Sequence, residues 1–323
     1  MKESTQIKTI GKIVSKQKAL IAVLLMLILM AFSRTNFYTP FNIVDMLNSS
    51  SILLILAFGV TMTVISGGCD LSIGGVMVVS GIIAIRLIND LQMNIALAIA
   101  VSLIFGAVIG FINGFLVVHQ KTEPFIITLG MGMALTGLAQ QLTNARPVTC
   151  DNEAFTLISN GKIIPGVTNL VMIMLVLFVI SHYVMRYTQF GRSMYAIGGD
   201  YDVARYSGIN VIFVKWATFV ICGVSAALAG VLLSSKLNSG SSIYGETTAL
   251  VVNCAVVVGG VSFAGGVGGI PQAALGLMVF GVLQNAMNML NIQSFAQILT
   301  QGAVIVAIIW LDSYSRKVKR ERV

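Results

Sequence analysis

The sequence is poor in the charged residues that cover the surfaces of most soluble proteins. Only 10% of its 323 residues are Asp, Glu, Lys or Arg and two are His, whereas 56% are hydrophobic. Soluble domains carry roughly 25% charged residues, so this composition excludes an ordinary soluble protein. The length suits about ten membrane-spanning helices of ~20 residues with short connections. We therefore expect an all-α, polytopic membrane bundle.

Cysteine and histidine are too sparse to indicate a disulfide framework or a metal site. The cysteines stand apart along the chain, at Cys69, Cys150, Cys222 and Cys254. Three lie in apolar runs and one in a polar loop, so we expect all four to pack as inert thiols. His119 and His182 are isolated near the ends of apolar runs. We expect both to pack at the membrane interface, and we expect no bound metal.

Sequence motifs for nucleotide binding and for hydrolysis are absent as well. The pairs Gly11-Lys12 and Gly161-Lys162 lack both the preceding glycine and the following Ser or Thr of a phosphate-binding loop. Neither H-E-x-x-H nor G-x-S-x-G occurs. We expect a chain without catalytic residues and without a cofactor of its own. Asp70 is almost alone as an ionisable group in the apolar runs, which argues against proton coupling but leaves sodium coupling open.

Ten apolar runs alternate with short polar segments. They lie near residues 19–32, 50–66, 72–88, 93–118, 125–143, 165–185, 212–235, 247–262, 268–290 and 295–312. With the amino terminus inside, fifteen of the twenty Lys and Arg residues fall on the inner side, in accordance with the positive-inside rule. Both termini are therefore expected in the cytoplasm. We expect ten spans, with one short segment open to a re-entrant course.

This pattern divides the chain into a cytoplasmic segment (1–18), one transmembrane domain (19–312) and a basic cytoplasmic tail (313–323). The basic head and the first apolar run are similar to a secretory signal, but no small-x-small cleavage site follows, so we expect an uncleaved first span. The net charge of +8 is explained by basic loops and tails that stay in the cytoplasm. We therefore expect membrane lipids, and no nucleic acid, as partners. The outward loop 144–164 is either a contact for an external partner or a plain connection.

The membrane segment Ser66–Gly75, SGGCDLSIGG, combines a carboxylate with clustered glycines. A carboxylate in mid-helix costs about 2.5–3.5 kcal/mol on insertion scales, so Asp70 should face protein or water. Clustered glycines weaken a continuous helix, as in the broken helices of transporters. A second cluster, Gly259–Gly269, falls on the same predicted side of the membrane. Two interpretations stay open: gates or hinges along a pathway, or a helix N-cap formed by Asp70 near Ser72.

Uncharged polar residues inside the spans are a further source of pathway candidates, although hydrogen bonding between helices explains most of them. Together with the glycine clusters they give one set of candidate pathway or gate residues: Gly67, Gly68, Asp70, Ser72, Gly74, Asn253, Gly259, Gly260, Ser262, Gly265, Gly266 and Asn285.

Gly106, Gly110 and Gly114 recur every four residues in one apolar run. Residues at this spacing share one face of a helix, and small residues there let two helix backbones approach closely. The stripe predicts tight packing against another helix and indicates no activity.

The segment Gly191–Val211 is a polar island between long apolar runs, and with its flanks it forms a cytoplasmic loop of about 186–211. Asp200 is suited to cap a short helix, Tyr201–Ser207, which Gly208 would end in a left-handed conformation. A helix of two turns is marginally stable alone, so we expect it to need a docking surface.

At this loop the sequence resembles the permease subunits of bacterial ATP-binding-cassette importers for monosaccharides, the ribose-type group. The resemblance covers nearly the whole chain and includes Asn36–Asn42 (NFYTPFN), Ile65–Gly74 (ISGGCDLSIG) and Pro124–Gly130 (PFIITLG). The most specific match is the loop, whose matching positions, with Arg205 between them, are Gly191, Arg192, Ala196, Gly198, Gly199, Asp200, Ala204, Ser207, Gly208 and Ile209.

The resemblance implies a mechanism that fits the missing phosphate-binding loop. Two permease subunits, identical or paralogous, would form the pathway in the bacterial cytoplasmic membrane. Separate ATP-binding subunits would hydrolyse ATP with Mg²⁺ in the cytoplasm, and a periplasmic or lipid-anchored sugar-binding protein would deliver a ribose-like pentose or a hexose. The loop helix would be the coupling element that docks on the ATPase.

One stretch departs from the family pattern. Between Tyr244 and Gly259 the usual Asp is absent, Glu246 stands in a shifted context, and Asn253 and Cys254 replace small residues. If that segment lines the pathway, solute choice or partner contact differs here from the commonest members. Two rival functions remain: a secondary transporter for a small polar solute and an intramembrane enzyme.

Overall fold

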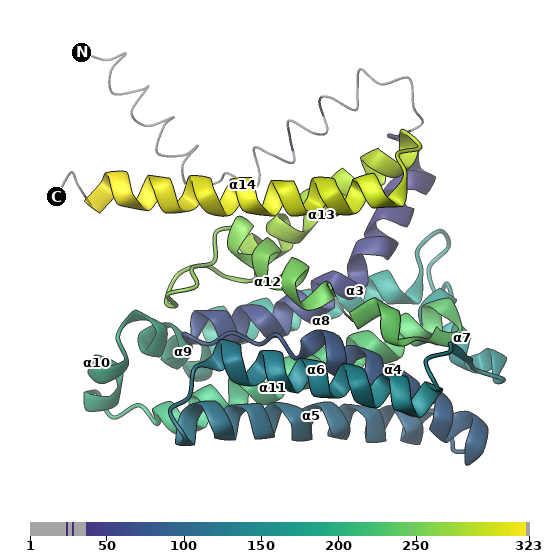
Figure 1. Cartoon of the computed structure of the whole chain (residues 1–323), viewed down its shortest axis with the longest axis horizontal. Helices are drawn as coiled ribbons and strands as arrows, with labels where there is room; N and C mark the ends of the chain where they lie inside the picture. The colour runs from purple at the N-terminus through teal and green to yellow at the C-terminus, as the bar shows by residue number, and fades with distance from the viewer. Residues whose placement is uncertain (1–23, 25–27, 29–36, 246, 321–323) are drawn as a thin grey trace.

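The computed structural model describes Leu24, Ile28 and the ranges 37–245 and 247–320, with backbone alone for 308–320. The run near 19–32, expected as the first span, and Glu246 lie outside the described residues, apart from Leu24 and Ile28. Helices make up most of the described chain (Figure 1). The strand content of that part is one antiparallel pair, β1 (Val148–Thr149) with β2 (Ser239–Gly240).

Seven helices in the described part are long and apolar enough to cross a membrane. They are α3 (Pro40–Ile65), α4 (Ile73–Asp90), α5 (Ile95–His119), α6 (Pro124–Thr143), α8 (Asn169–Tyr187), α11 (Val211–Leu237) and α13 (Ile270–Met289). Each coincides with one of the expected apolar runs, so the all-α, polytopic membrane fold is confirmed.

Two further apolar runs also form helices, which are not among these seven. The run expected at 247–262 gives α12 (Thr248–Val258), which follows the 3-10 turn η1 (Ser242–Gly245). Its 11 residues are about 16 Å long, short of the ~30 Å hydrocarbon core, so α12 alone does not cross the membrane. The last helix, α14 (Ser294–Arg320), contains the expected apolar run 295–312 and lies along one side of the bundle beside α12 and α13 (Figure 1).

Helix α11 packs against α3, α4 and α5 and lies beside α5 in the view of Figure 1. Its contact with α5 is the glycine stripe that the sequence predicts. A Cβ at Gly106 would overlap the main-chain oxygen of Gly223 in α11, and a Cβ at Gly223 would overlap that of Gly106. The two backbones therefore touch directly, with no side chain between them.

The connections gather at the two ends of this bundle (Figure 1). At one end, α9 (Gln189–Gly199) and α10 (Tyr201–Tyr206) join α8 to α11. At the other, α7 (Glu153–Asn160) follows β1 and packs against α11. The cysteine in this second region, Cys150, is buried with Phe155 in a small apolar cluster, in agreement with the expected packing of its thiol.

Candidate functional site

The short helix predicted in the polar island is α10. Asp200 is its N-cap, and the carboxylate accepts hydrogen bonds from the main-chain nitrogens of Asp202 and Val203, each at 3.0 Å. Gly208 has φ +82°, a left-handed conformation that follows the helix end. Both ends of this helix agree with the prediction.

Helix α10 exposes large apolar side chains beside charged ones, Asp202 among them, at the end of the bundle. Tyr206 is 88% exposed and Val203 is 62% exposed, whereas Ala204 on the opposite side is buried. Arg192 and Arg205 are also exposed, and the Lys215 ammonium lies 5.7 Å from the centre of the Tyr201 ring. Exposed apolar side chains rimmed by basic groups are typical of a protein contact surface.

Helix α9 fixes α10 to the bundle and was not expected from the sequence. Met194 and Ile197 are buried, and Gly191 lies so close to Met185 that a Cβ would overlap its main-chain oxygen. The Tyr195 hydroxyl donates a hydrogen bond to the main-chain oxygen of Gly268 at 2.7 Å. Burial raises the pKa of the Tyr195 phenol, so the group stays protonated and keeps this bond at neutral pH.

The structure brings the polar island and the second glycine cluster together. A Cβ at Gly198 would overlap the main-chain oxygen of Ile65 and the main-chain nitrogen of Gly266. Gly266 itself donates a main-chain hydrogen bond to Ile65 at 2.9 Å. Gly265 and Gly266 have φ of +89° and +70°, which favours glycine at both positions. We call this contact between α9, the end of α3 and the loop 259–269 the glycine junction.

The segment 66–72, between α3 and α4, is non-helical and holds Asp70 inside the protein. The Asp70 side chain is 1% exposed, and its Oδ1 accepts from the main-chain nitrogen of Ser72 at 2.8 Å and from the Ser72 hydroxyl at 2.6 Å. Asn113 of α5 donates to the Ser72 hydroxyl at 2.8 Å. The N-cap position of α4 is Ser72, so Asp70 stands two residues before it and holds the turn that leads into the helix.

Two neighbouring helices, α6 and α12, bind the backbone of this segment. The Leu71 nitrogen donates to the Thr128 hydroxyl of α6 at 3.0 Å, and Asn253 of α12 donates to the main-chain oxygen of Asp70 at 3.0 Å. Asn253 therefore contacts the segment directly and belongs to the same buried polar cluster. Around this cluster, in the part of the chain that the structure describes, His, Cys, Asp and Glu side chains form no group of three suited to a metal ion.

The other candidate pathway residues occupy different places. Gly67 and Gly260 are exposed turn residues with positive φ, and Ser262 lies in the loop 259–269, where its hydroxyl accepts from the Ala264 nitrogen. Tight backbone packing accounts for three glycines: Gly68 beside Thr63, Gly74 against Gly245, and Gly259 against Gln272. Asn285 lies apart from these groups, in a reciprocal amide pair with Asn42 of α3 at 2.9 Å in each direction.

Comparisons with known proteins match this chain over most of its length. The family described as "Branched-chain amino acid transport system / permease component" matches residues 42–309. The chain belongs to this permease family. It is similar to "Ribose import permease protein RbsC" of Haemophilus influenzae, with 33% identity over 97% of this chain and 98% of that protein. The protein of that name in Bacillus subtilis is 34% identical over 93% of both chains.

A third relative widens the comparison. The "L-arabinose transport system permease protein AraH" of Escherichia coli is 31% identical over 96% of this chain and 94% of its own length. The permease family and the seven apolar helices make this chain a multi-pass protein of the bacterial inner membrane. As a permease component it is a transport subunit and not itself an enzyme.

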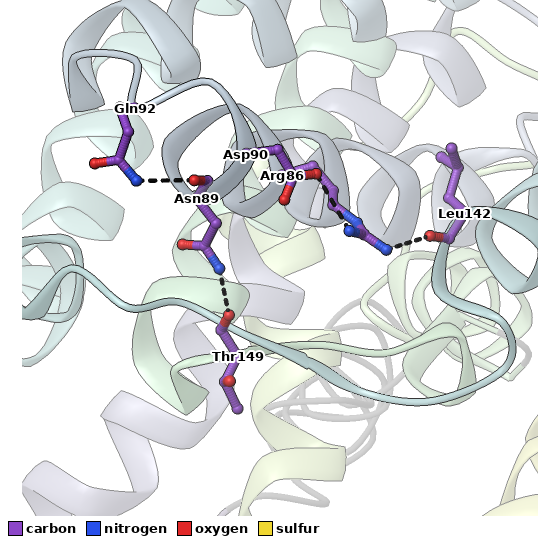
Figure 2. A network of polar contacts seen from close by, with 6 residues as sticks. All are labelled: Arg86, Asn89, Asp90, Gln92, Leu142 and Thr149. Atoms are coloured by element: carbon purple, nitrogen blue, oxygen red, sulfur yellow. Dashed lines mark hydrogen bonds and ion pairs between the residues drawn. The ribbon is translucent and has the colours of Figure 1, made fainter.

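At the end of the permease opposite to α9, a polar network fixes the loop after α6 to α4 (Figure 2). Asn89 donates to the main-chain oxygen of Thr149 at 2.8 Å and accepts from the Asp151 nitrogen at 3.1 Å. Arg86 pairs with Asp90 at 3.2 Å and donates to the main-chain oxygen of Leu142 at 3.0 Å. The loop is therefore an ordered part of the bundle.

Replacement of Asn89 by alanine is expected to loosen this loop. The change removes both side-chain hydrogen bonds to the loop, and a net contribution of about 0.5–1.5 kcal/mol each predicts faster cleavage within 144–164 by an added protease. Gln92→Ala is the matched control, because Gln92 donates back to the main-chain oxygen of Asn89 and not to the loop. Equal cleavage rates in the two variants would contradict the assignment.

Proposed function

We propose that this permease is the membrane-spanning subunit of an ATP-driven importer for a monosaccharide, a ribose-like pentose or a hexose. The observation that carries the proposal is the similarity to ribose and arabinose permeases over more than nine-tenths of the chain. The family description names amino acids, whereas these relatives name sugars at about a third identity. We give more weight to the individual relatives than to the family description, and they favour a sugar as the transported solute.

The surface formed by α9 and α10 is the proposed docking site of the ATP-binding subunit. Its exposed apolar and basic side chains suit a protein partner, and the Asp200 cap presents α10 as a preformed element. ATP and Mg²⁺ belong to that partner, and this chain binds no cofactor. Closure of the ATPase would move α9 and α10 as a rigid body. The α10 end, both termini and the basic tail then lie in the cytoplasm, and ten spans are expected when η1 and α12 are counted together as one broken span.

The opposite end, with α7 and the Asn89 network, is then the periplasmic face. A periplasmic or lipid-anchored sugar-binding protein would dock there, and a second permease subunit, identical or paralogous, would complete the pathway. The ordered loop after α6 gives such a partner a fixed surface, which supports the interpretation of 144–164 as a contact rather than a plain connection.

Reconstitution tests the proposal directly. In proteoliposomes, the chain with its ATP-binding subunit and the binding protein should take up sugar only when ATP is present on the cytoplasmic side. The purified chain alone should show no ATP hydrolysis. Uptake that follows an ion gradient without ATP would support the secondary transporter instead, and turnover of a substrate by the isolated chain would support the intramembrane enzyme.

Charge reversal at Arg192 is expected to weaken binding of the ATP-binding subunit. Arg192 is exposed on α9, where its guanidinium donates to the main-chain oxygen of Tyr187 at 3.3 Å. A carboxylate there loses this bond and reverses the charge of the contact surface, which typically affects association. Arg146→Glu, exposed at the far end, is the matched control. Co-purification of the ATPase should fall for Arg192→Glu only; equal recovery would exclude this surface.

A further inference from the structure

The glycine junction joins three segments that are far apart in sequence. Their backbones are in direct contact there. Gly198 leaves no room for a Cβ because of Ile65 and Gly266, and a Cβ at Gly265 would lie 2.8 Å from the Gly198 Cα. Side chains can change rotamer and absorb a displacement, whereas backbone atoms in direct contact cannot. A movement of the end of α9 must therefore displace the end of α3 and the loop 259–269.

On one side of the junction, the loop 259–269 is held as a unit. The Ser262 nitrogen donates to the main-chain oxygen of Val267 at 3.0 Å, and the Gly265 nitrogen donates to that of Ser262 at 3.0 Å. The Tyr195 hydroxyl of α9 binds the next turn at Gly268. The loop thus has two independent attachments to α9, one by backbone packing and one by a side-chain hydrogen bond.

On the other side, Ile65 is the last residue of α3 and is followed directly by the segment 66–72. The Gly68 nitrogen donates a hydrogen bond to the main-chain oxygen of Thr63 at 2.9 Å, so the segment folds back onto the end of α3. Asn253 then connects it to α12, the helix that enters the loop 259–269. The two glycine clusters are in this way linked both through the junction and through α12.

We propose that the glycine junction transmits the movement of α9 to the segment 66–72 and the loop 259–269, which together form the cytoplasmic boundary of the pathway. This inference rests on the proposed function, since it assumes that an ATPase moves α9. Gly198, Gly265, Gly266 and Tyr195 are then positioning residues for transport, and the Asp70 cluster lies at the inner edge of the gate.

Two helical glycines provide a matched test. Gly198 fills the junction, whereas Gly137 lies outside it on the exposed face of α6, where a Cβ would have no described atom within 4 Å. In the full complex with ATPase and binding protein, Gly198→Ala should still bind the ATPase and hydrolyse ATP. Sugar taken up per ATP should fall about tenfold, within the usual range of coupling free energies. Gly137→Ala should keep the wild-type ratio.

Two results would overturn the proposal: a wild-type uptake-to-ATP ratio for Gly198→Ala, or a loss of ATPase binding in that variant as large as its loss of uptake. If Gly198→Ala fails to fold, Tyr195→Phe replaces it, because only the hydrogen bond to Gly268 is removed. That variant should lower the ratio in the same direction, and an unchanged ratio would overturn the proposal. Failure of the wild-type chain to bind an ATPase would instead refute the proposed function itself.

Discussion

Substitution of Gly223 by valine is expected to abolish folding of the bundle. Gly223 is buried where α11 meets α5, and even a Cβ there would overlap the main-chain oxygen of Gly106. Overpacking a core side chain costs about 1–3 kcal/mol, but here the obstacle is backbone, so the two helices must separate along their contact. That contact is the most extensive one between two elements of the described chain. Total stabilities of about 5–15 kcal/mol leave little reserve for such a change.

The control is Gly137→Val, on the exposed face of α6, where a Cβ would have no described atom within 4 Å. Both variants add the same side chain to an apolar helix, so helix propensity and hydrophobicity change equally. Size-exclusion profiles of detergent-solubilised, fluorescently tagged protein should show a monodisperse peak for Gly137→Val and aggregate for Gly223→Val. A normal peak for Gly223→Val would show that α5 and α11 are not packed in this way.

The packing of α5 against α11 is only partly predictable from the sequence. Spacing alone predicts that Gly106 and Gly110 share one face and that the face is tightly packed. It does not identify α11 as the partner, because periodicity tells which residues lie together and not which helix covers them. The match between Gly106 and Gly223 depends on the path of the intervening chain.

The polar island Gly191–Val211 is also only partly predictable from the sequence. Asp200 and Gly208 predict α10 because caps and left-handed stops are local signals that act within a few residues. Helix α9 also has a cap, since the Thr188 hydroxyl accepts from the Gly191 nitrogen, but Gly191 and the two terminal glycines are poor helix formers, so the sequence does not predict it. The contact of Gly198 with Gly265 joins α9 to a loop beyond α11 and α12, and no local rule predicts it. The family resemblance includes Gly198, and the second glycine cluster includes Gly265, but neither predicts their contact.

Replacement of Asp70 by alanine is expected to destabilise the permease strongly, whereas Asp70→Asn should fold and transport. Alanine removes the acceptor for the nitrogen and the hydroxyl of Ser72, and two buried groups without a partner cost roughly 2–5 kcal/mol together. Asparagine keeps an Oδ1 in the same position. Its amide also places a donor beside Asn113, whose Oδ1 lacks a hydrogen-bond partner among the described residues.

Thermal unfolding in detergent and uptake in proteoliposomes measure the two variants together. The expected order of stability is wild type and Asp70→Asn above Asp70→Ala, with uptake following the folded fraction. Since Asp70 is 1% exposed and binds the residue that begins α4, a holding role needs only the oxygen atom and not the charge. A folded Asp70→Asn protein without uptake would show instead that transport needs the negative charge of Asp70. Asp70 would then belong to the pathway, as the gate interpretation of the carboxylate holds.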